Sequence, residues 1–166
     1  IEVAVGADMC TAEEAEDFLK KVPAEQPFMA TSCCPSWSVM AKKLFPQFKD
    51  YISMAMTPMV LTARLYKKDH PDVRIVFIGP CTAKKLEASR RTIRSDVDFV
   101  LTFEELQGMF EAKNVRFEDI PKEEEVPLNQ GTGAGRGFAV TGGVAGAVVD
   151  AIHRMDPDRE VKVASA

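Results

Sequence analysis

The stretch that decides the fold class is Val73-Arg74-Ile75-Val76-Phe77-Ile78-Gly79-Pro80-Cys81-Thr82-Ala83-Lys84-Lys85. Its first six residues are almost continuously apolar, which predicts a strand with both faces covered. Cys81 follows the strand, and a short helix is predicted directly after it. A strand that leads straight into a helix is typical of an α/β fold with a largely parallel sheet.

The rest of the chain continues this alternation. Strands are also predicted at residues 1–5, 27–31 and 97–101, and helices at residues 12–22, 35–48, 57–68, 103–113 and 141–155. Thr11, with Glu14 three residues later, predicts a capping box for the first helix. Thr102 is predicted to cap the helix at residues 103–113. We therefore expect a single domain over residues 1–166: a layered α/β fold with a mostly parallel sheet flanked by helices and with cysteine motifs at the carboxyl ends of strands.

The composition narrows the class of protein. Of the 166 residues, 46% are hydrophobic and 28% are charged, as is usual for a globular domain. The net charge of −4 argues against a nucleic-acid partner, and no apolar run reaches the roughly 20 residues of a membrane span.

Because the first residue is Ile1 rather than Met, we expect a piece of a longer parent chain. Four cysteines are too few for a disulfide scaffold, which favours a reducing compartment such as the cytoplasm.

Three of the four cysteines stand where a predicted helix begins. Cys33 and Cys34 lie in Thr31-Ser32-Cys33-Cys34-Pro35-Ser36-Trp37, whose proline suits a first helical position, and Cys81 precedes the helix that contains Lys84. A helix N-terminus offers free N–H groups and partial positive charge, which favour a thiolate or an anionic ligand such as an iron–sulfur cluster. Core packing, a zinc site and a reactive thiol at Cys33 are alternatives, and Cys10 is expected to be a buried core residue.

Two other patterns have structural interpretations that compete with functional ones. Residues 131–135 form a glycine-rich loop, but the lysine of a phosphate-binding loop is missing, so close backbone packing is favoured over a phosphate cradle. The carboxylates within residues 13–17 predict the solvated face of a helix, and the acidic run at residues 123–125 is expected to be solvated too.

Taken together, the motifs resemble those of iron-only (FeFe) hydrogenases. Residues 31–37 are similar to the first signature motif of that family, and Gly79-Pro80-Cys81-Thr82-Ala83-Lys84-Lys85-Leu86-Glu87 to the second. Residues 132–138, with residues 141–144, resemble the stretch that leads toward the third motif. The resemblance covers residues 6–154 in the family's order.

The resemblance implies roles for single residues around the family's H-cluster, a 4Fe-4S cubane joined to a di-iron subcluster. Cys34 and Cys81 match two of the four thiolates that bind the cubane. Cys33 matches the cysteine that relays protons near the distal iron, and Lys84 the lysine that donates to a cyanide ligand. Phe138 matches an aromatic residue that packs near the cluster.

The resemblance also implies a proton path to water. Ser53, Glu14 and Asp17 fall at or near the positions of the family's proton-exit chain. For the two carboxylates, the alignment with the family requires a one-residue gap before Cys33. Asp17 replaces a glutamate and is shorter. A row of neighbouring titratable groups can carry protons to a buried metal, whereas the cofactor carries out the redox chemistry.

The departures from the family pattern define the alternatives. Gly79 stands where catalytic members have a methionine, and Met56 and Met59 replace more polar residues, as in the sensory or regulatory branch. The third motif, with its two further thiolates, is absent, so we expect a fragment of the catalytic domain without an assembled cluster and without activity of its own. The parent is expected to be a hydrogenase linked to an electron carrier such as ferredoxin, or a hydrogen sensor. The alternative is a non-enzymatic, hydrogenase-like iron–sulfur scaffold or assembly protein.

Overall fold

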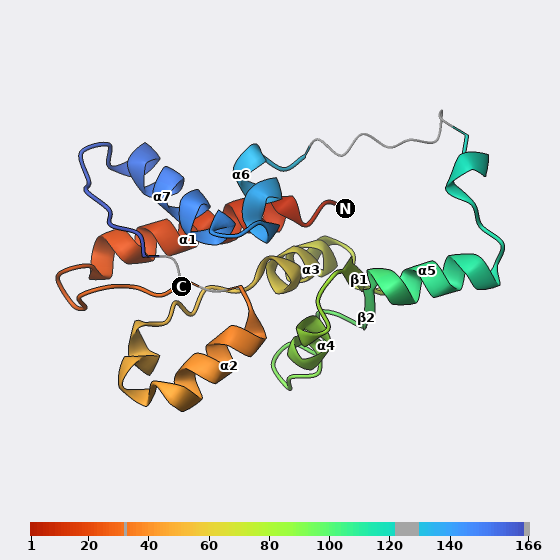
Figure 1. The fold of residues 1–166 in the computed structure, drawn as a ribbon, viewed down its shortest axis with the longest axis horizontal. Coiled ribbons are helices and arrows are strands. Elements are labelled where there is room, and N and C mark those ends of the chain that lie inside the picture. The colour runs from red at the N-terminus through yellow and green to blue at the C-terminus, as the bar shows by residue number, and fades with distance from the viewer. Residues whose placement is uncertain (32, 122–129, 165–166) are drawn as a thin grey trace. The chain divides into compact units, whose positions relative to one another are not determined.

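The computed structural model describes residues 1–31, 33–121 and 130–164. The chain divides into two compact units (Figure 1). The terminal unit comprises residues 1–62 and 130–166, and the central unit comprises residues 63–129. Each unit is described by itself below.

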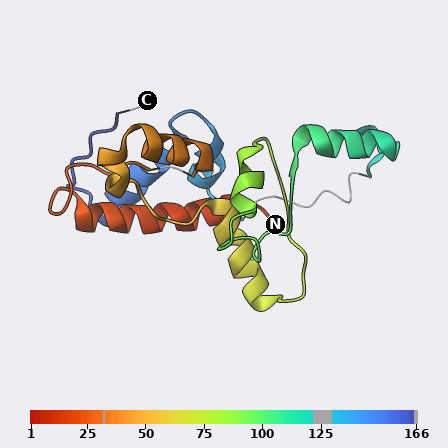
Figure 2. The same cartoon turned by 90° about the horizontal axis from the view of Figure 1, so that it is seen from below.

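The terminal unit is helical. It contains α1 (Ala4–Lys21), α2 (Pro35–Leu44), the 3₁₀ helix η1 (Pro46–Tyr51), the start of α3 (Pro58–Asp69), the short α6 (Gly133–Arg136), the 3₁₀ turn η4 (Gly137–Ala139) and α7 (Gly143–Met155). The two long helices α1 and α7 pack against each other, and both views show them side by side (Figures 1 and 2). Their core is built from small and branched side chains on both helices: Ala15, Val148, Ala151 and Ile152. Small residues in both helices allow this close approach.

The central unit holds a small parallel sheet. It contains the rest of α3, β1 (Val76–Gly79), α4 (Ala83–Ala88), β2 (Phe99–Thr102), α5 (Phe103–Ala112) and the 3₁₀ turn η2 (Phe117–Asp119). β1 and β2 pair in parallel, with Val76 opposite Phe99 and Gly79 opposite Thr102, and the connection between them contains α4. The unit is thus a βαβ unit, and the predicted α/β class is confirmed, with a sheet of two strands within the described residues.

Thr102 shows how local sequence starts a helix here. Its hydroxyl accepts a hydrogen bond from the N–H of Glu105 (3.2 Å), and the Glu105 carboxylate accepts one from the N–H of Thr102 (2.9 Å). This reciprocal pair is the predicted cap of α5, and it satisfies two N–H groups that a helix start leaves without partners. The start of α3 at Pro58 and of α2 at Pro35 also agree with prediction.

The predictions for the first residues were wrong. Residues 1–5 do not form a strand, because α1 already begins at Ala4. Thr11 lies inside this helix, where its hydroxyl donates to the carbonyl oxygen of Ala7 (2.8 Å) instead of capping a helix start. The cause is tertiary packing: Gly6 lies so close to α3 that a Cβ on it would come within 2.1 Å of the Thr62 hydroxyl. Gly6 thus allows a close contact between two helices.

Three further boundaries differ from prediction. Residues 27–31 contribute only an isolated parallel bridge between Ala30 and Ile52. The helix predicted over residues 35–48 ends at Leu44, because Pro46 lacks the N–H needed to continue it and η1 follows. Residues 133–135 of the predicted glycine-rich loop belong to the short helix α6, and α7 begins at Gly143.

The strand β1 is less covered than predicted. Val76 and Ile78 are 46% and 43% exposed, so the expectation that both faces are covered is wrong for the described chain.

The acidic run at residues 123–125 lies outside the described residues. Among the described residues, no helix combines the length and the apolar character needed to cross a bilayer.

Candidate functional site

The adjacent cysteines stand at the N-terminus of α2. Cys34 is the N-cap residue of this helix, and Pro35 occupies its first turn. The N–H of Trp37 donates to the Cys34 sulfur at 3.5 Å, so the sulfur takes the place of the usual side-chain oxygen. Cys33 and Cys34 are both half-buried, and neither forms a disulfide. The partial positive charge at the N-terminus of a helix stabilises the negative charge of a thiolate, which is the form of cysteine that binds metals.

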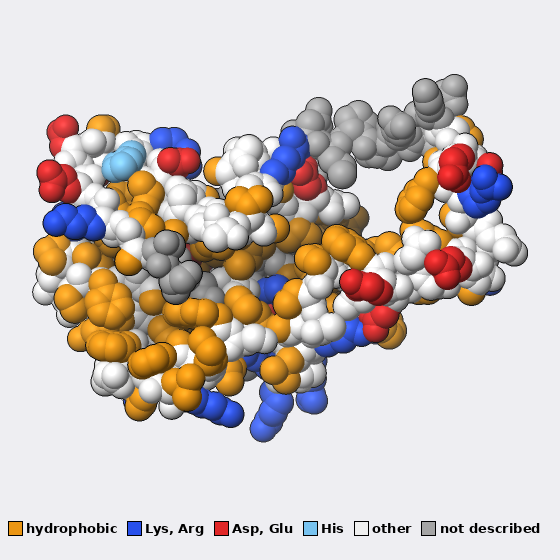
Figure 3. All heavy atoms as spheres, in the orientation of Figure 1, with side chains coloured by type: hydrophobic (Ala, Val, Ile, Leu, Met, Phe, Trp, Pro, Cys, Tyr) orange, Lys and Arg blue, Asp and Glu red, His pale blue; other side chains and the backbone are white. Residues whose placement is uncertain are grey.

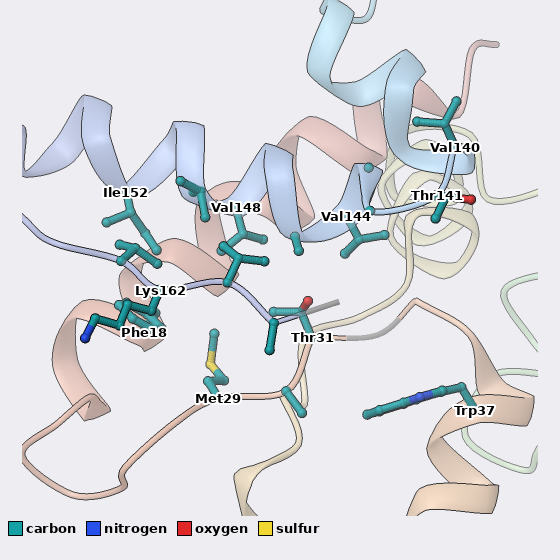
Figure 4. A pocket seen from close by; sticks show the side chains of 18 residues that line it. Phe18, Met29, Thr31, Trp37, Val140, Thr141, Val144, Val148, Ile152 and Lys162 are labelled. Atoms are coloured by element: carbon teal, nitrogen blue, oxygen red, sulfur yellow. The ribbon is translucent and has the colours of Figure 1, made fainter. Parts of the chain in front are cut away.

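An apolar pocket of about 340 Å³ adjoins this segment in the terminal unit (Figure 4). Thr31 and Trp37, on either side of the cysteines, both line it. Met29 and Val148 face its interior from opposite walls, which belong to the segment before the cysteines and to α7. The cysteine motif therefore lies beside a pocket with a mostly apolar lining.

Cys81 lies in the central unit, in the connection from β1 to α4. It is exposed, and like the other three cysteines it forms no disulfide. The main-chain N–H of Lys84 donates to the carbonyl oxygen of Cys81 (3.3 Å), which folds the start of α4 back onto the cysteine. A strand end followed by a helix start is the position that the sequence predicted for this residue.

The side chain of Lys84 is held by a carboxylate that the sequence analysis did not single out. Its Nζ lies 2.8 Å from Oε2 of Glu87, and the two side chains are only 13% and 3% exposed. The spacing of opposite charges three residues apart on a helix is the signal that could have identified Glu87. Because the pair is mostly withdrawn from water, it fixes the ammonium group more firmly than a surface pair would.

Glu14 is a buried carboxylate in the terminal unit. It is 3% exposed, so the predicted solvated face holds for Glu13 and Glu16 but is wrong for Glu14. Burial raises the pKa of Glu14; the hydrogen bond from the Ser53 hydroxyl acts in the opposite direction, and the nearby charges of Glu13 and Asp17 raise it further. The structure thus brings Glu14 and Ser53 into contact. Asp17 is partly exposed.

Two main-chain interactions position Ser53 for this contact. Its N–H donates to the carbonyl oxygen of Ala30 (2.8 Å), next to the isolated bridge. Its hydroxyl oxygen accepts a hydrogen bond from the N–H of Ala55 (3.2 Å), which leaves the hydroxyl proton for the carboxylate. Asp17 forms an ion pair with Lys21 (2.7 Å) one turn farther along α1.

The glycine-rich segment is anchored to α1, as the packing interpretation predicted. A Cβ on Gly135 would lie 2.5 Å from the carbonyl oxygen of Ala4. Asp8 accepts hydrogen bonds from the N–H (2.8 Å) and hydroxyl (2.5 Å) of Thr132. Glu2 accepts from Arg136 (2.6 Å), and this bond is the main reason why the pKa of Glu2 is lowered to about 2. The N–H groups of Gly131, Thr132 and Gly135 and the guanidinium group of Arg136 therefore donate within the fold.

The remaining predicted residue is Phe138, which is half-buried in η4. Cys33, Cys34, Glu14, Asp17, Ser53 and Phe138 belong to the terminal unit, and Cys81 and Lys84 to the central unit. Within the described part of the chain, no group of three or more His, Cys, Asp or Glu side chains is arranged to hold a metal ion.

Known proteins with similar sequences and structures bear on this geometry. The family described as "Iron only hydrogenase large subunit, C-terminal domain" matches residues 1–165. Iron hydrogenase 1 of Clostridium pasteurianum is 33% identical over 153 residues, which are 84% of this chain and 27% of that protein. A cytosolic Fe-S cluster assembly factor of Phaeosphaeria nodorum is 33% identical over 121 residues, 59% of this chain and 19% of that protein.

The structural similarity agrees with the sequence. A variant of the apo [FeFe]-hydrogenase from Chlamydomonas reinhardtii matches 93% of this chain with a TM-score of 0.73 and 31% identity. The match covers 43% of that structure, so the chain spans less than half the length of these relatives. A family match over nearly every residue, together with this shared fold, shows that the chain belongs to the family of the iron-only hydrogenase large subunit, C-terminal domain.

Proposed function

We propose that the chain is one lobe of the catalytic domain of an iron-only hydrogenase, whose full-length protein oxidises hydrogen, reduces protons or senses hydrogen. The observation that supports it most is the Cys34 sulfur at the N-cap of α2, where it accepts the Trp37 N–H within a chain matched by the family over residues 1–165. The proposal includes a cytoplasmic location and exchange of electrons with a soluble carrier such as ferredoxin.

The donor set fits part of the family's iron–sulfur group. Cys34 and Cys81 supply thiolates, the ligands that iron–sulfur clusters use, and both are free of disulfides. They would supply two of the four thiolates of a 4Fe-4S cubane, and the sulfur of Cys34 already accepts a hydrogen bond from the Trp37 N–H. When bound, the H-cluster supplies the electron transfer and hydrogen chemistry.

The chain's other residues would then handle protons and polar ligands. In this proposal Cys33 holds a proton at its sulfur near the cluster, and the buried pair of Glu14 and Ser53 passes protons toward Asp17, which is partly exposed. Lys84, oriented by Glu87, would donate a hydrogen bond to a polar ligand of the di-iron subcluster when that group is bound. Phe138 would pack near the cluster.

Cysteine variants of the reconstituted full-length protein test these assignments. Iron and sulfide content should fall strongly in Cys34→Ser and Cys81→Ser, because each change removes a cluster ligand. Cys33→Ser should keep the iron but lose hydrogen turnover, because only the proton donor is removed. Cys10→Ala is the matched control, since Cys10 is a buried core residue of α1. Unchanged iron content in both Cys34→Ser and Cys81→Ser would contradict the proposal.

A second function is favoured by a different similarity. The match to the Phaeosphaeria assembly factor fits a hydrogenase-like scaffold without hydrogen turnover. Hydrogen turnover by the full-length protein, matured with its di-iron cofactor, distinguishes a hydrogenase from a scaffold. No turnover at full cluster occupancy would favour the scaffold or a sensor. Turnover that rises in Gly79→Met would favour an attenuated enzyme, although the new side chain must displace the Phe77 ring, which lies 2.7 Å from a Cβ at this position.

A further inference from the structure

The connection between α4 and β2 carries three arginines on the surface of the central unit. Arg90, Arg91 and Arg94, here called the arginine loop, are all exposed. Among the described residues none of the three takes part in an ion pair, although acidic residues are close by in sequence. In Figure 3, Lys and Arg side chains stand out around α4.

The arginine loop is a fixed feature of the surface. The N–H groups of Ile93 and Arg94 donate to the carbonyl oxygen of Arg90 (3.0 and 2.9 Å), which forms a tight turn. Two side chains of α3 tie the end of this turn down. Arg64 donates to the carbonyl oxygen of Thr92 (3.4 Å), and Lys67 donates to that of Ser95 (2.8 Å). The three arginines are therefore presented on a backbone that is already ordered, which lowers the entropy cost of binding a partner.

The nearest acids are neutralised by other bases. Asp96 is paired with Arg64 (2.7 Å), and Asp98 with both Lys67 (2.8 Å) and Arg74 (3.0 Å). Residues 63–94 contain nine Lys or Arg against three Asp or Glu. The two acids that follow the arginine loop in sequence are thus paired with other bases, and the loop lies in a segment with an excess of positive charge.

We propose that the arginine loop is a docking surface for the acidic face of a small electron-carrier protein, an inference that rests on the proposed function. The loop follows α4, a helix of six residues and thus about 9 Å long, whose other end adjoins Cys81. A carrier bound there would stand close to the thiolate that is proposed to hold the cluster. Arginine suits this role because it stays charged and pairs with carboxylates in a bidentate manner, and because such charges speed association.

An extended polyanion fits the same surface poorly. Residues 95–121 of the same unit contain seven Asp or Glu and only two Lys or Arg. α5 carries three glutamates and no base. A nucleic acid or an anionic membrane would meet this negative segment next to the arginines, whereas a small protein with one acidic patch need not. The net charge of −4 points the same way.

The test measures binding and turnover separately in the full-length protein. The probe is a small acidic ferredoxin, and its Kd is measured by calorimetry at low and at high salt. We expect Arg90→Gln, Arg91→Gln and Arg94→Gln together to raise the Kd about tenfold at low salt and to flatten its salt dependence. The same three positions changed to Lys keep the charge but lose the bidentate geometry, so they should retain the salt dependence and raise the Kd less than the Gln variant does. Lys42→Gln, Lys43→Gln and Lys49→Gln form the charge-matched control, because these lysines are a second exposed basic group, and they should leave the Kd unchanged.

Three results would overturn the docking proposal: an equal Kd in wild type and arginine triple variant, a loss of binding in the lysine control instead, or tighter binding of an oligonucleotide or of phosphatidylserine vesicles through the same arginines. Hydrogen turnover with methyl viologen is the separate readout of the proposed function, since a small dye needs no docking surface. A wild type that binds ferredoxin through the arginines but shows no viologen-linked turnover would contradict the enzymatic function and leave the docking surface standing.

Discussion

The hydroxyl of Ser53 donates a hydrogen bond to the buried carboxylate of Glu14. The contact joins α1 to the segment after η1, and the Ser53 main chain is fixed by the carbonyl oxygen of Ala30. Because burial outweighs this hydrogen bond, the pKa of Glu14 is raised above its ordinary value. A carboxyl group that keeps its proton to higher pH, in contact with a hydroxyl, is a group that can both donate and accept protons.

The pH dependence of stability tests this state of Glu14. A raised pKa in the folded protein means that the stabilising contribution of Glu14 is fully present below its unfolded pKa and is lost as the pH rises through its folded pKa. Glu14→Gln removes this titration, so the stability of the wild type relative to the variant should fall as the pH rises from 4 toward neutrality. Urea unfolding of both proteins across this range measures the difference. Glu16→Gln is the matched control, because Glu16 is exposed on the same helix; a wild-type curve parallel to that of Glu14→Gln would contradict the prediction.

The burial of the Lys84–Glu87 pair leads to a second prediction. Glu87→Gln should lower the free energy of unfolding by about 3 kcal/mol, because removing the charge of one partner leaves the Lys84 ammonium group in a mostly buried place without its counter-charge. The neighbouring pair of Lys85 and Glu105 provides the control, since those side chains are 40% and 44% exposed. Glu105→Gln keeps the capping hydrogen bond of α5 and should cost less than about 1 kcal/mol. Equal costs in the two variants, measured by chemical denaturation, would show that burial does not distinguish the pairs.

Glu105 and Glu14 show what the sequence can and cannot predict. The cap of α5 was predictable because both of its partners, Thr102 and Glu105, lie within one turn of chain. The helix start at Pro35, which places Cys34 at the N-cap, was predictable for the same reason. Glu14 looked like part of a solvated face because its hydrogen-bond partner, Ser53, is distant in sequence.

The wrong strand at residues 1–5 has a related cause. Val3, Val5 and their neighbours have the composition of a strand, yet α1 includes residues 4 and 5. Gly6 is the point where α1 meets α3, and only the folded chain shows that contact. In β1, the apolar run correctly indicated a strand but could not show how far its faces are covered.

The glycines of the segment that precedes α7 give the third prediction, because two of them differ in surroundings within one helix turn. A Cβ on Gly135 would lie 2.5 Å from the carbonyl oxygen of Ala4 and 2.6 Å from Oδ1 of Asp8, whereas a Cβ on Gly133 would meet nothing within 4 Å. Gly135→Ala should therefore push α6 away from α1 and lower the free energy of unfolding by about 1–3 kcal/mol. Gly133→Ala should be neutral or raise it by up to about 1 kcal/mol, because alanine restricts the unfolded chain and fits the helix. Thermal or urea unfolding of the two variants measures the difference, and a Gly135→Ala protein as stable as Gly133→Ala would mean that α6 does not pack on α1 as closely as these distances require.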